Sequence, residues 1–262
     1  MALALAACGQ APAPPPTPAN APTSRVVTSS TPTVAPTAWQ QLAAGVEVRD
    51  LEVPVAGHTV SGTVIRLDPT QIRLRVSYTP GAVQFLDRWA DAAPSALVTF
   101  NGGYFTPQAV AMGAVVVEGQ ASGRSLQGYG GMLAATGSGQ ITVRSLRAQP
   151  YRSQERLTAA VQCYPMLVVG GAAPNLNGVN SERARRTVVA TNATGQLLVI
   201  AITDPISLAE TSAWLLAGDL QISQALNLDG GGSTGIALRT PRLRRTIPAL
   251  SPLPLVVQVL PR

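Results

Sequence analysis

A short stretch near the end of the chain combines one carboxylate, three glycines and two hydroxyls, directly after an apolar run. Glycine adopts backbone angles closed to other residues, so the chain can turn sharply there and its N–H groups can converge on one point. The hydroxyls can donate hydrogen bonds to an oxygen-rich ligand or accept them from it. Taken alone, the pattern is typical either of a catalytic turn or of a plain glycine-rich hairpin. Its residues are Asp229, Gly230, Gly231, Gly232, Ser233 and Thr234.

A second apolar run, residues 96–100, also ends in a polar side chain followed by glycines. Asn101 provides an amide donor and acceptor at this strand end. Gly102 and Gly103 let the backbone turn or approach a ligand closely. Of the two aromatic residues that follow, Tyr104 or Phe105 could provide a wall for a sugar ring, although core packing is the more usual role of an aromatic there.

Three arginines occur within four residues, just before the apolar run 187–190. Cations held this close together repel one another unless an anion or water compensates them. The cluster is therefore either a solvated face or a phosphate-binding group. We expect Arg186, which adjoins the strand, to point into a site, in contrast to Arg183 and Arg185.

Gln162 is a polar residue in the apolar run 157–169, and a buried amide needs hydrogen-bond partners. Its neighbour Cys163 is predicted to be a buried thiol rather than half of a disulfide. The reason is that Cys8, the only other cysteine, is expected to carry a lipid.

Composition excludes several kinds of chemistry, because the 262 residues include 19 basic residues, all arginine, and one histidine. Without lysine there is no lysine-containing phosphate-binding loop and no Schiff base. A Ser-His-Asp triad would depend on His58 alone, and histidine-rich metal sites cannot form within one chain. We expect His58 in a surface loop. We predict no cofactor and no metal site, with a bound divalent cation left open. No basic run is interleaved with aromatics, so no nucleic-acid partner is predicted despite the net charge of +6.

Two helices are predicted to accompany the strands. Apolar spacing favours one over residues 83–90. A second opens at a capping box made by Ser207 and Glu210, continues to Ala217 and has Gly218 as its C-cap. Glu210 is therefore read as a capping residue rather than a catalytic one.

Most of the remaining apolar runs alternate or are short, which is typical of strands. Residues 68–71 read as a turn between two of them, and strands 187–190 and 196–202 read as a hairpin. The expected fold is α+β, with mixed, largely antiparallel sheets and a few helices in a single domain.

The N-terminal part is interpreted as a targeting region. Residues 1–7 resemble the end of a bacterial lipoprotein signal peptide, and Cys8 is the residue that would carry the lipid. Residues 8–38 are rich in Pro, Ala and Thr and cannot bury enough apolar surface to fold, so they read as a tether. The folded domain is expected over residues 39–262. This organisation predicts an exported protein that is lipid-anchored in a bacterial cell envelope.

Five motifs in order resemble the phosphodiester glycosidase family over roughly residues 60–260. They lie at residues 101–105, 162–167, 185–187, 207–217 and 227–234. One departure is Cys163, where a small hydroxyl residue is more usual. The resemblance implies a mixed α+β fold whose loops meet at one site, with Asp229 and Arg186 as catalytic residues. The substrate-binding residues that it implies are Asn101, Gly102, Gly103, Gln162, Asn227, Gly230, Gly231, Gly232, Ser233 and Thr234.

The resemblance implies hydrolysis of a sugar-1-phosphodiester at the sugar carbon, with an envelope or extracellular glycopolymer as the expected substrate. Arginine grips phosphate oxygens through paired hydrogen bonds, and phosphate leaves readily. Asp229 would either attack the sugar carbon or activate water, and Glu182 is the candidate for a second carboxylate.

Two other functions stay open at this point. One is a non-catalytic envelope lipoprotein that binds polysaccharide through the same pocket. The other is a metal-dependent phosphodiesterase that cuts on the phosphorus side, which the shortage of clustered carboxylates and histidines disfavours.

Overall fold

The computed structural model describes residues 38–55, 57–179 and 182–262, and these belong to one compact unit. The predicted signal peptide, Cys8 and the predicted tether up to residue 37 lie outside the described residues. Within the described part, no helix combines the length and apolar character needed to cross a membrane.

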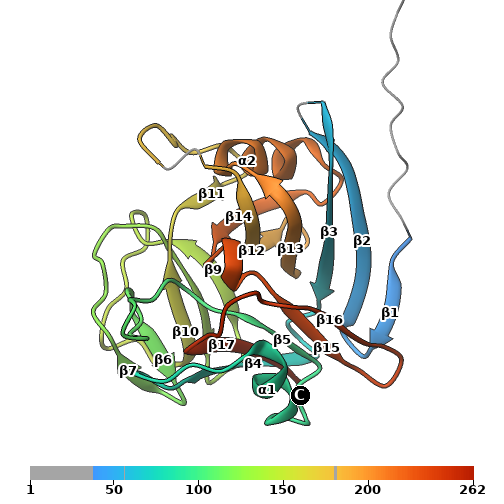
Figure 1. Ribbon diagram of the computed structural model, residues 1–262. Coiled ribbons are helices and arrows are strands. Elements are labelled where there is room, and N and C mark those ends of the chain that lie inside the picture. The colour runs from blue at the N-terminus through green and yellow to red at the C-terminus, as the bar shows by residue number, and fades with distance from the viewer. Residues whose placement is uncertain (1–37, 56, 180–181) are drawn as a thin grey trace, which may run out of the picture. The chain divides into compact units, whose positions relative to one another are not determined.

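A seven-stranded sheet runs through the middle of this unit (Figure 1). Every pairing in it is antiparallel. Its order is β1 (Gln40–Ala43), β2 (Val46–Val55), β3 (His58–Leu67), β13 (Leu197–Ile206), β12 (Ala184–Asn192), β14 (Ile222–Asn227) and β11 (Met166–Val169).

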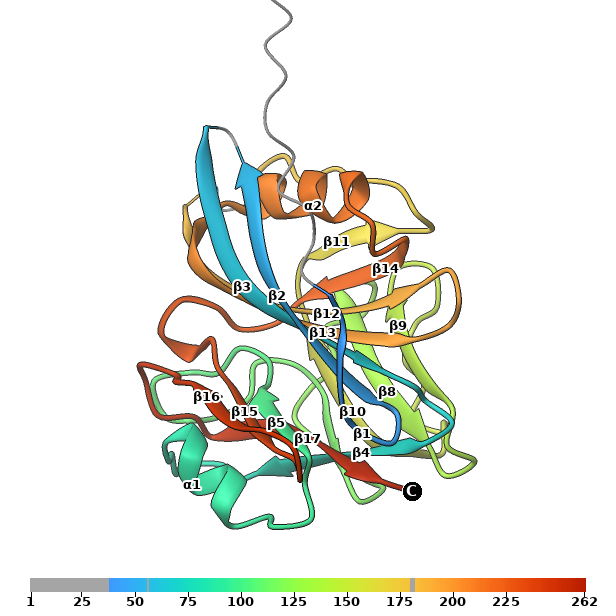
Figure 2. The same cartoon turned by 90° about the vertical axis from the view of Figure 1, so that its right-hand side faces the viewer.

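Two five-stranded antiparallel sheets lie on one side of it (Figure 2). The first has the order β7 (Gln120–Ser122), β6 (Val115–Val117), β10 (Leu157–Cys163), β8 (Gly131–Thr136) and β9 (Ile141–Ser145). The second has the order β16 (Arg244–Ile247), β15 (Ile236–Arg239), β5 (Val98–Asn101), β17 (Leu255–Pro261) and β4 (Ile72–Tyr78).

Strand β13 shows why the large sheet is central, because both of its faces are buried. Leu197 and Val199 face a core shared with the two smaller sheets. Leu198 and Ile200 face a second core, to which helix α2 (Leu208–Ala217) contributes Leu215. Continuous apolar sequence is expected for a strand covered on both sides.

Figure 1 shows α2 over the face of the large sheet that lies away from the smaller sheets. The predicted capping box is confirmed, because Ser207 accepts from the Glu210 N–H and the Glu210 carboxylate accepts from the Ser207 N–H. Gly218 is the C-cap, with an extended rather than a left-handed backbone. The first predicted helix is shorter than expected and lies further along the chain, as α1 (Leu86–Asp91).

The predicted fold class is confirmed in part, since in the described ranges two short helices accompany sheets that make this part of the chain largely β. The hairpin of β12 and β13 forms as expected, with Thr191 opposite Leu197. The turn at residues 68–71 also forms, but its flanking strands, β3 and β4, belong to different sheets. The prediction for His58 was wrong. It begins β3 opposite Val55, and its Nε2 lies 3.3 Å from Arg183 Nη1.

Candidate active site

The glycine-rich stretch connects two sheets. Strand β14 of the large sheet ends at Asn227, and β15 of a smaller sheet begins at Ile236. Between them the chain makes one short 3-10 turn, η1 (Gly231–Ser233), which Gly231 enters with a φ of 57°. Glycine tolerates that left-handed angle without strain. Asp229 therefore stands where the chain leaves one sheet for another.

Asn101 joins the two sheets at this crossing. Its Oδ1 accepts from Thr187 Oγ1 of β12 at 2.7 Å and from the Gly235 N–H at 3.2 Å. Its Nδ2 donates to the Asp229 carbonyl at 2.7 Å and to the Gly102 carbonyl at 3.3 Å. The side chain is completely buried. All four hydrogen-bonding positions are occupied by the protein, so Asn101 positions the Asp229 loop.

The two glycines after Asn101 provide close packing. A Cβ on Gly102 would lie 2.3 Å from Leu255 Cδ1, and one on Gly103 would lie 2.8 Å from the Gln162 carbonyl oxygen. The Gly102 carbonyl also accepts from the Asp229 N–H at 3.1 Å. These contacts give both glycines a structural role, and substrate contact by this turn stays a prediction.

A pocket of about 350 Å³ opens beside Asp229. Segments from all three sheets, helix α2 and the loop before β12 line it. Of the residues predicted for the site, Asp229, Gly230 and Arg186 are brought together here. The described residues that line it are Tyr104, Tyr129, Tyr164, Pro165, Gly178, Val179, Arg186, Leu208, Asp229 and Gly230.

Burial raises the pKa of Asp229 to about 6, because the charged form loses hydration. Hydrogen bonds from Ser233 and from the Gly230 N–H, which lies 2.9 Å from Oδ1, oppose that rise. Asp229 is also the only carboxylate among the described residues that line the pocket. It is therefore ionised at neutral pH and close enough to its pKa to exchange a proton.

Arg186 is buried in β12 and is held by neutral partners. Its Nε donates to the Ile206 carbonyl at 3.0 Å, and its Nη2 donates to the Glu182 carbonyl. Burial lowers the pKa of the guanidinium, which stays charged at neutral pH. Its Nη1 lies 3.7 Å from the place that a Cβ on Gly230 would take. The pocket thus holds a fixed cation beside the Asp229 loop.

Tyr104 lines the same pocket, whereas Asn227 does not line it and holds the Tyr104 hydroxyl. The Asn227 Nδ2 donates to the Tyr104 hydroxyl at 2.8 Å and to the carbonyls of Tyr164 and Leu228. Burial, with smaller contributions from Cys163 and Asp229, raises the pKa of Tyr104 well above its ordinary value. The hydroxyl oxygen accepts from Asn227, so its own proton is available to the pocket.

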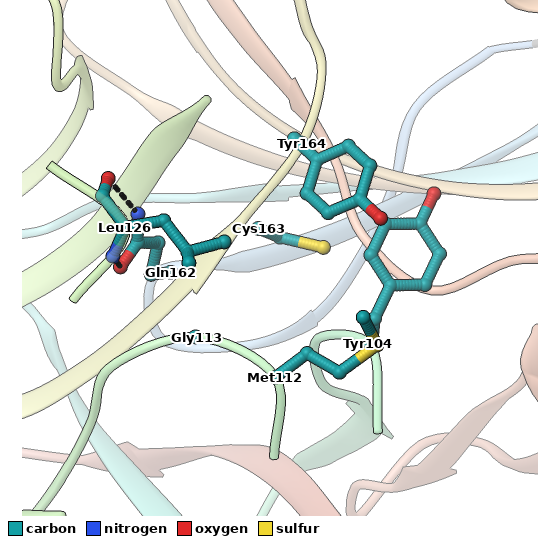
Figure 3. Close-up of a pocket in the computed structure, with 7 residues that line it drawn as sticks. All are labelled: Tyr104, Met112, Gly113, Leu126, Gln162, Cys163 and Tyr164. Carbon is teal, nitrogen blue, oxygen red and sulfur yellow. Dashed lines mark hydrogen bonds between the residues drawn. The ribbon is translucent and has the colours of Figure 1, made fainter. Parts of the chain in front are cut away.

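Gln162 is buried and holds a neighbouring loop. Its Nε2 donates to the carbonyls of Leu126 and Tyr129, and its Oε1 accepts from the N–H groups of Leu126 and Ala114. Figure 3 shows this clamp against Leu126, with the rings of Tyr104 and Tyr164 close together. The surrounding cavity measures only about 10 Å³, so Gln162 acts through the loop that it fixes.

The remaining predicted residues do not line the pocket. A Cβ on Gly232 would lie 2.5 Å from Ser251 Oγ. Thr234 is completely buried, and its hydroxyl finds no hydrogen-bond partner in the described part of the chain. Glu182 is exposed and does not line the pocket. Cys163 is a free, buried thiol, as predicted, and burial raises its pKa to about 12.

Sequence reasoning missed six residues of the pocket lining, among them the two tyrosines Tyr129 and Tyr164. The rings of Tyr164 and Tyr104 have centroids 4.7 Å apart, and those of Tyr164 and Tyr129 are 5.0 Å apart. Their positions in the chain show no periodic pattern that would have identified them. Across the described ranges, no three histidine, cysteine, aspartate or glutamate side chains gather as a metal site would require.

A family model described as phosphodiester glycosidase matches residues 95–250, which is more than half of the chain. That span contains Asn101, Arg186 and Asp229. No curated protein matches the sequence.

Solved structures share the fold at low sequence identity. The catalytic domain of zebrafish N-acetylglucosamine-1-phosphodiester alpha-N-acetylglucosaminidase, auto-inhibited by its pro-peptide, is 15% identical with a TM-score of 0.68, covering 87% of each chain. A hypothetical protein from Synechocystis is 17% identical with a TM-score of 0.65, covering 87% of this chain and 64% of its own. A Burkholderia pseudomallei protein classed as exported is 15% identical with a TM-score of 0.58, covering 79% and 75%.

Proposed function

The chain belongs to the phosphodiester glycosidase family, and from that premise we propose that it hydrolyses a sugar-1-phosphodiester at the sugar carbon. Water adds to that carbon, the bond from carbon to the phosphate oxygen breaks, and the remainder keeps a phosphate monoester. The zebrafish enzyme of similar fold is named for a sugar-1-phosphodiester, which supports this choice of bond.

One observation carries the proposal: Asp229 and Arg186 line the same pocket. The cation compensates the negative phosphate, and its planar guanidinium matches two phosphate oxygens. The ionised Asp229 carboxylate serves either as the nucleophile or as the base that activates water. Phosphate monoesters have a second pKa near 6, so the leaving group needs little protonation.

The neutral Tyr104 hydroxyl completes this arrangement as a hydrogen-bond donor. Asn227 fixes its oxygen from one side, which leaves the proton for a phosphate or sugar oxygen. Donors that are already in place when charge develops stabilise a transition state without reorganisation.

Hydrolysis of phenyl phosphodiesters of common pyranoses in heavy-oxygen water tests the proposal. Free sugar that carries the heavy oxygen is the expected product, because water attacks carbon. Label in the phosphate would indicate cleavage on the phosphorus side. Tight binding without any product would favour a polysaccharide-binding lipoprotein instead.

We further propose that the substrate is an envelope or extracellular glycopolymer and that the protein reaches it from a lipid anchor on Cys8. A lipid together with the Pro-rich residues 8–38 would hold the domain near a membrane surface. Mass spectrometry of the membrane fraction should find a lipid-modified N-terminal Cys8, with Cys8→Ala as the control. An unmodified Cys8 in a purely soluble product would rule out the anchor.

A further inference from the structure

Tyr129 is an exposed aromatic side chain at the mouth of the active-site pocket. Its relative exposure is 53%, although it lines the same pocket as Asp229. Tyr164 packs on it with ring centroids 5.0 Å apart, and Tyr164 in turn packs on Tyr104 at 4.7 Å. The three rings therefore lead from the partly buried Tyr104 to the solvent-exposed Tyr129.

The backbone that carries Tyr129 is firmly held. Buried Gln162 donates to the Tyr129 carbonyl at 3.1 Å and makes two further hydrogen bonds to Leu126. The following Gly130 has a φ of 68°, and a Cβ on it would lie only 2.1 Å from the Cys163 carbonyl oxygen. A buried amide is thus used to fix a surface loop, and the loop presents an aromatic ring to solvent.

A fixed, exposed ring next to a polar pocket suits a sugar. The face of a pyranose carries C–H groups that pack on an aromatic ring, while its hydroxyls remain hydrated. The Tyr104 hydroxyl is hydrogen-bonded at 2.8 Å to Asn227, two residues before Asp229, so we place the reacting sugar against Tyr104. Tyr129 lies beyond Tyr164 and meets the part of the substrate that is one ring further out.

We propose that Tyr129 and Tyr164 form a stacking platform for a second pyranose, so that the preferred substrate is an oligosaccharide or glycan chain rather than a single phosphate-linked sugar. This inference rests on the proposed function for its place beside the reaction. Its binding test uses phosphate-free glycans and is independent of turnover.

Calorimetry of the full chain with cellotetraose, chitotetraose and maltotetraose tests the platform directly. At least one of these should bind, and Tyr129→Ala should weaken that binding about tenfold, while Tyr129→Phe keeps the ring and stays within about twofold. The matched control is Phe85→Ala, because Phe85 is equally exposed, at 56%, but lies outside the pocket lining. Absence of binding by all three, or equal binding by Tyr129→Ala, would overturn the proposal.

Kinetics separate this proposal from the proposed function. The ratio of kcat/KM for a disaccharide phenyl phosphodiester to that for the corresponding monosaccharide should fall about tenfold in Tyr129→Ala. An unchanged ratio with normal hydrolysis would overturn the stacking platform and leave the proposed function intact. Glycan binding that depends on Tyr129, without hydrolysis of either compound, would overturn the proposed function and leave the stacking platform intact.

Discussion

The turn after β5 and the turn after β14 both place a polar side chain and consecutive glycines at the end of a buried strand. In the first, Asn101 is completely buried and all of its hydrogen bonds go to the protein. In the second, Asp229 lines a pocket of about 350 Å³ that Arg186 also lines. The first turn holds the second, because Asn101 donates to the Asp229 carbonyl.

The difference between the two turns is one of surroundings rather than of local sequence. The β5 turn is covered by strands of two sheets, so its amide stabilises their junction. The β14 turn faces a gap that tyrosines and α2 surround but do not fill. A strand end that carries a polar residue and glycines therefore indicates a special position, and its neighbours decide whether that position supports structure or chemistry.

The largest expected effect is that of Asp229→Asn, which changes the turn after β14 and not the turn after β5. Turnover should fall by about a thousandfold or more, because the substitution removes the only carboxylate among the described residues that line the pocket. The melting temperature should stay the same or rise slightly, since a buried charge is removed. Steady-state kinetics and thermal unfolding measure the two quantities. Near wild-type turnover would show that Asp229 is not catalytic.

Asn101→Ala should act in the opposite way, because its main expected effect is a loss of folding stability. It leaves Thr187 Oγ1, the Gly235 N–H and the Asp229 carbonyl without their partner, and each buried group left unpaired costs about 1–3 kcal/mol. We expect the free energy of unfolding to fall by about 3 kcal/mol or more in urea titrations.

The control for Asn101 is Asn192→Ala. Asn192 makes three side-chain hydrogen bonds, against four for Asn101, but it is partly exposed, so water can replace them. Its loss should cost about 1 kcal/mol or less. Equal losses for the two asparagines would contradict the junction role of Asn101.

Arg186→Ala tests the contribution of the pocket cation to turnover at the turn after β14. A hydrogen-bonded cation on a phosphate contributes about 1.5–3 kcal/mol, so kcat/KM on a phosphodiester should fall by roughly 10–150-fold. Arg185→Ala is the matched control, because Arg185 donates to the Pro248 carbonyl and does not line the pocket. Similar losses for both arginines would mean that Arg186 acts through general charge rather than through contact.

Tyr104→Phe tests whether the Tyr104 hydroxyl contributes to turnover. Losing one hydrogen-bond donor should reduce kcat/KM about tenfold while the ring packing is kept. Tyr164→Phe removes a hydroxyl from the adjacent ring and should reduce it by about twofold at most. If the two variants behave alike, the Tyr104 hydroxyl has no special role.

The smallest expected effect near neutral pH is the titration of Asp229. If the ionised carboxylate is the active form, kcat/KM should fall to about half near pH 6 and about tenfold further for each unit below. The folded-state pKa lies above the ordinary value of 3.8, so the folded protein holds the proton more tightly. Stability from this group is therefore present below pH 3.8 and is lost as the pH rises towards 6. Asp229→Asn should abolish that component of the stability curve, and its persistence would assign it to another group.

Short-range features of the sequence were enough to predict much of this molecule. The Ser207 and Glu210 capping box, the β12–β13 hairpin and the buried Cys163 follow from propensity, turn residues and apolar patterning. The absence of lysine and the single histidine restricted the chemistry before any fold was known. The sequence also predicts Asp229 and Arg186 for one site, and both line the pocket.

Tertiary structure alone decided which polar residues face the pocket and which hold it in place. Asn101 meets Thr187 across 86 positions of sequence and Asp229 across 128, and no local pattern encodes such distances. The same is true of Tyr129 and Tyr164, because the loop that brings Tyr129 to the pocket is held by Gln162, 33 positions further along the chain. Residue types determined which chemistry was available, whereas burial and long-range hydrogen bonds determined where it takes place, because both depend on strands that meet only in the folded chain.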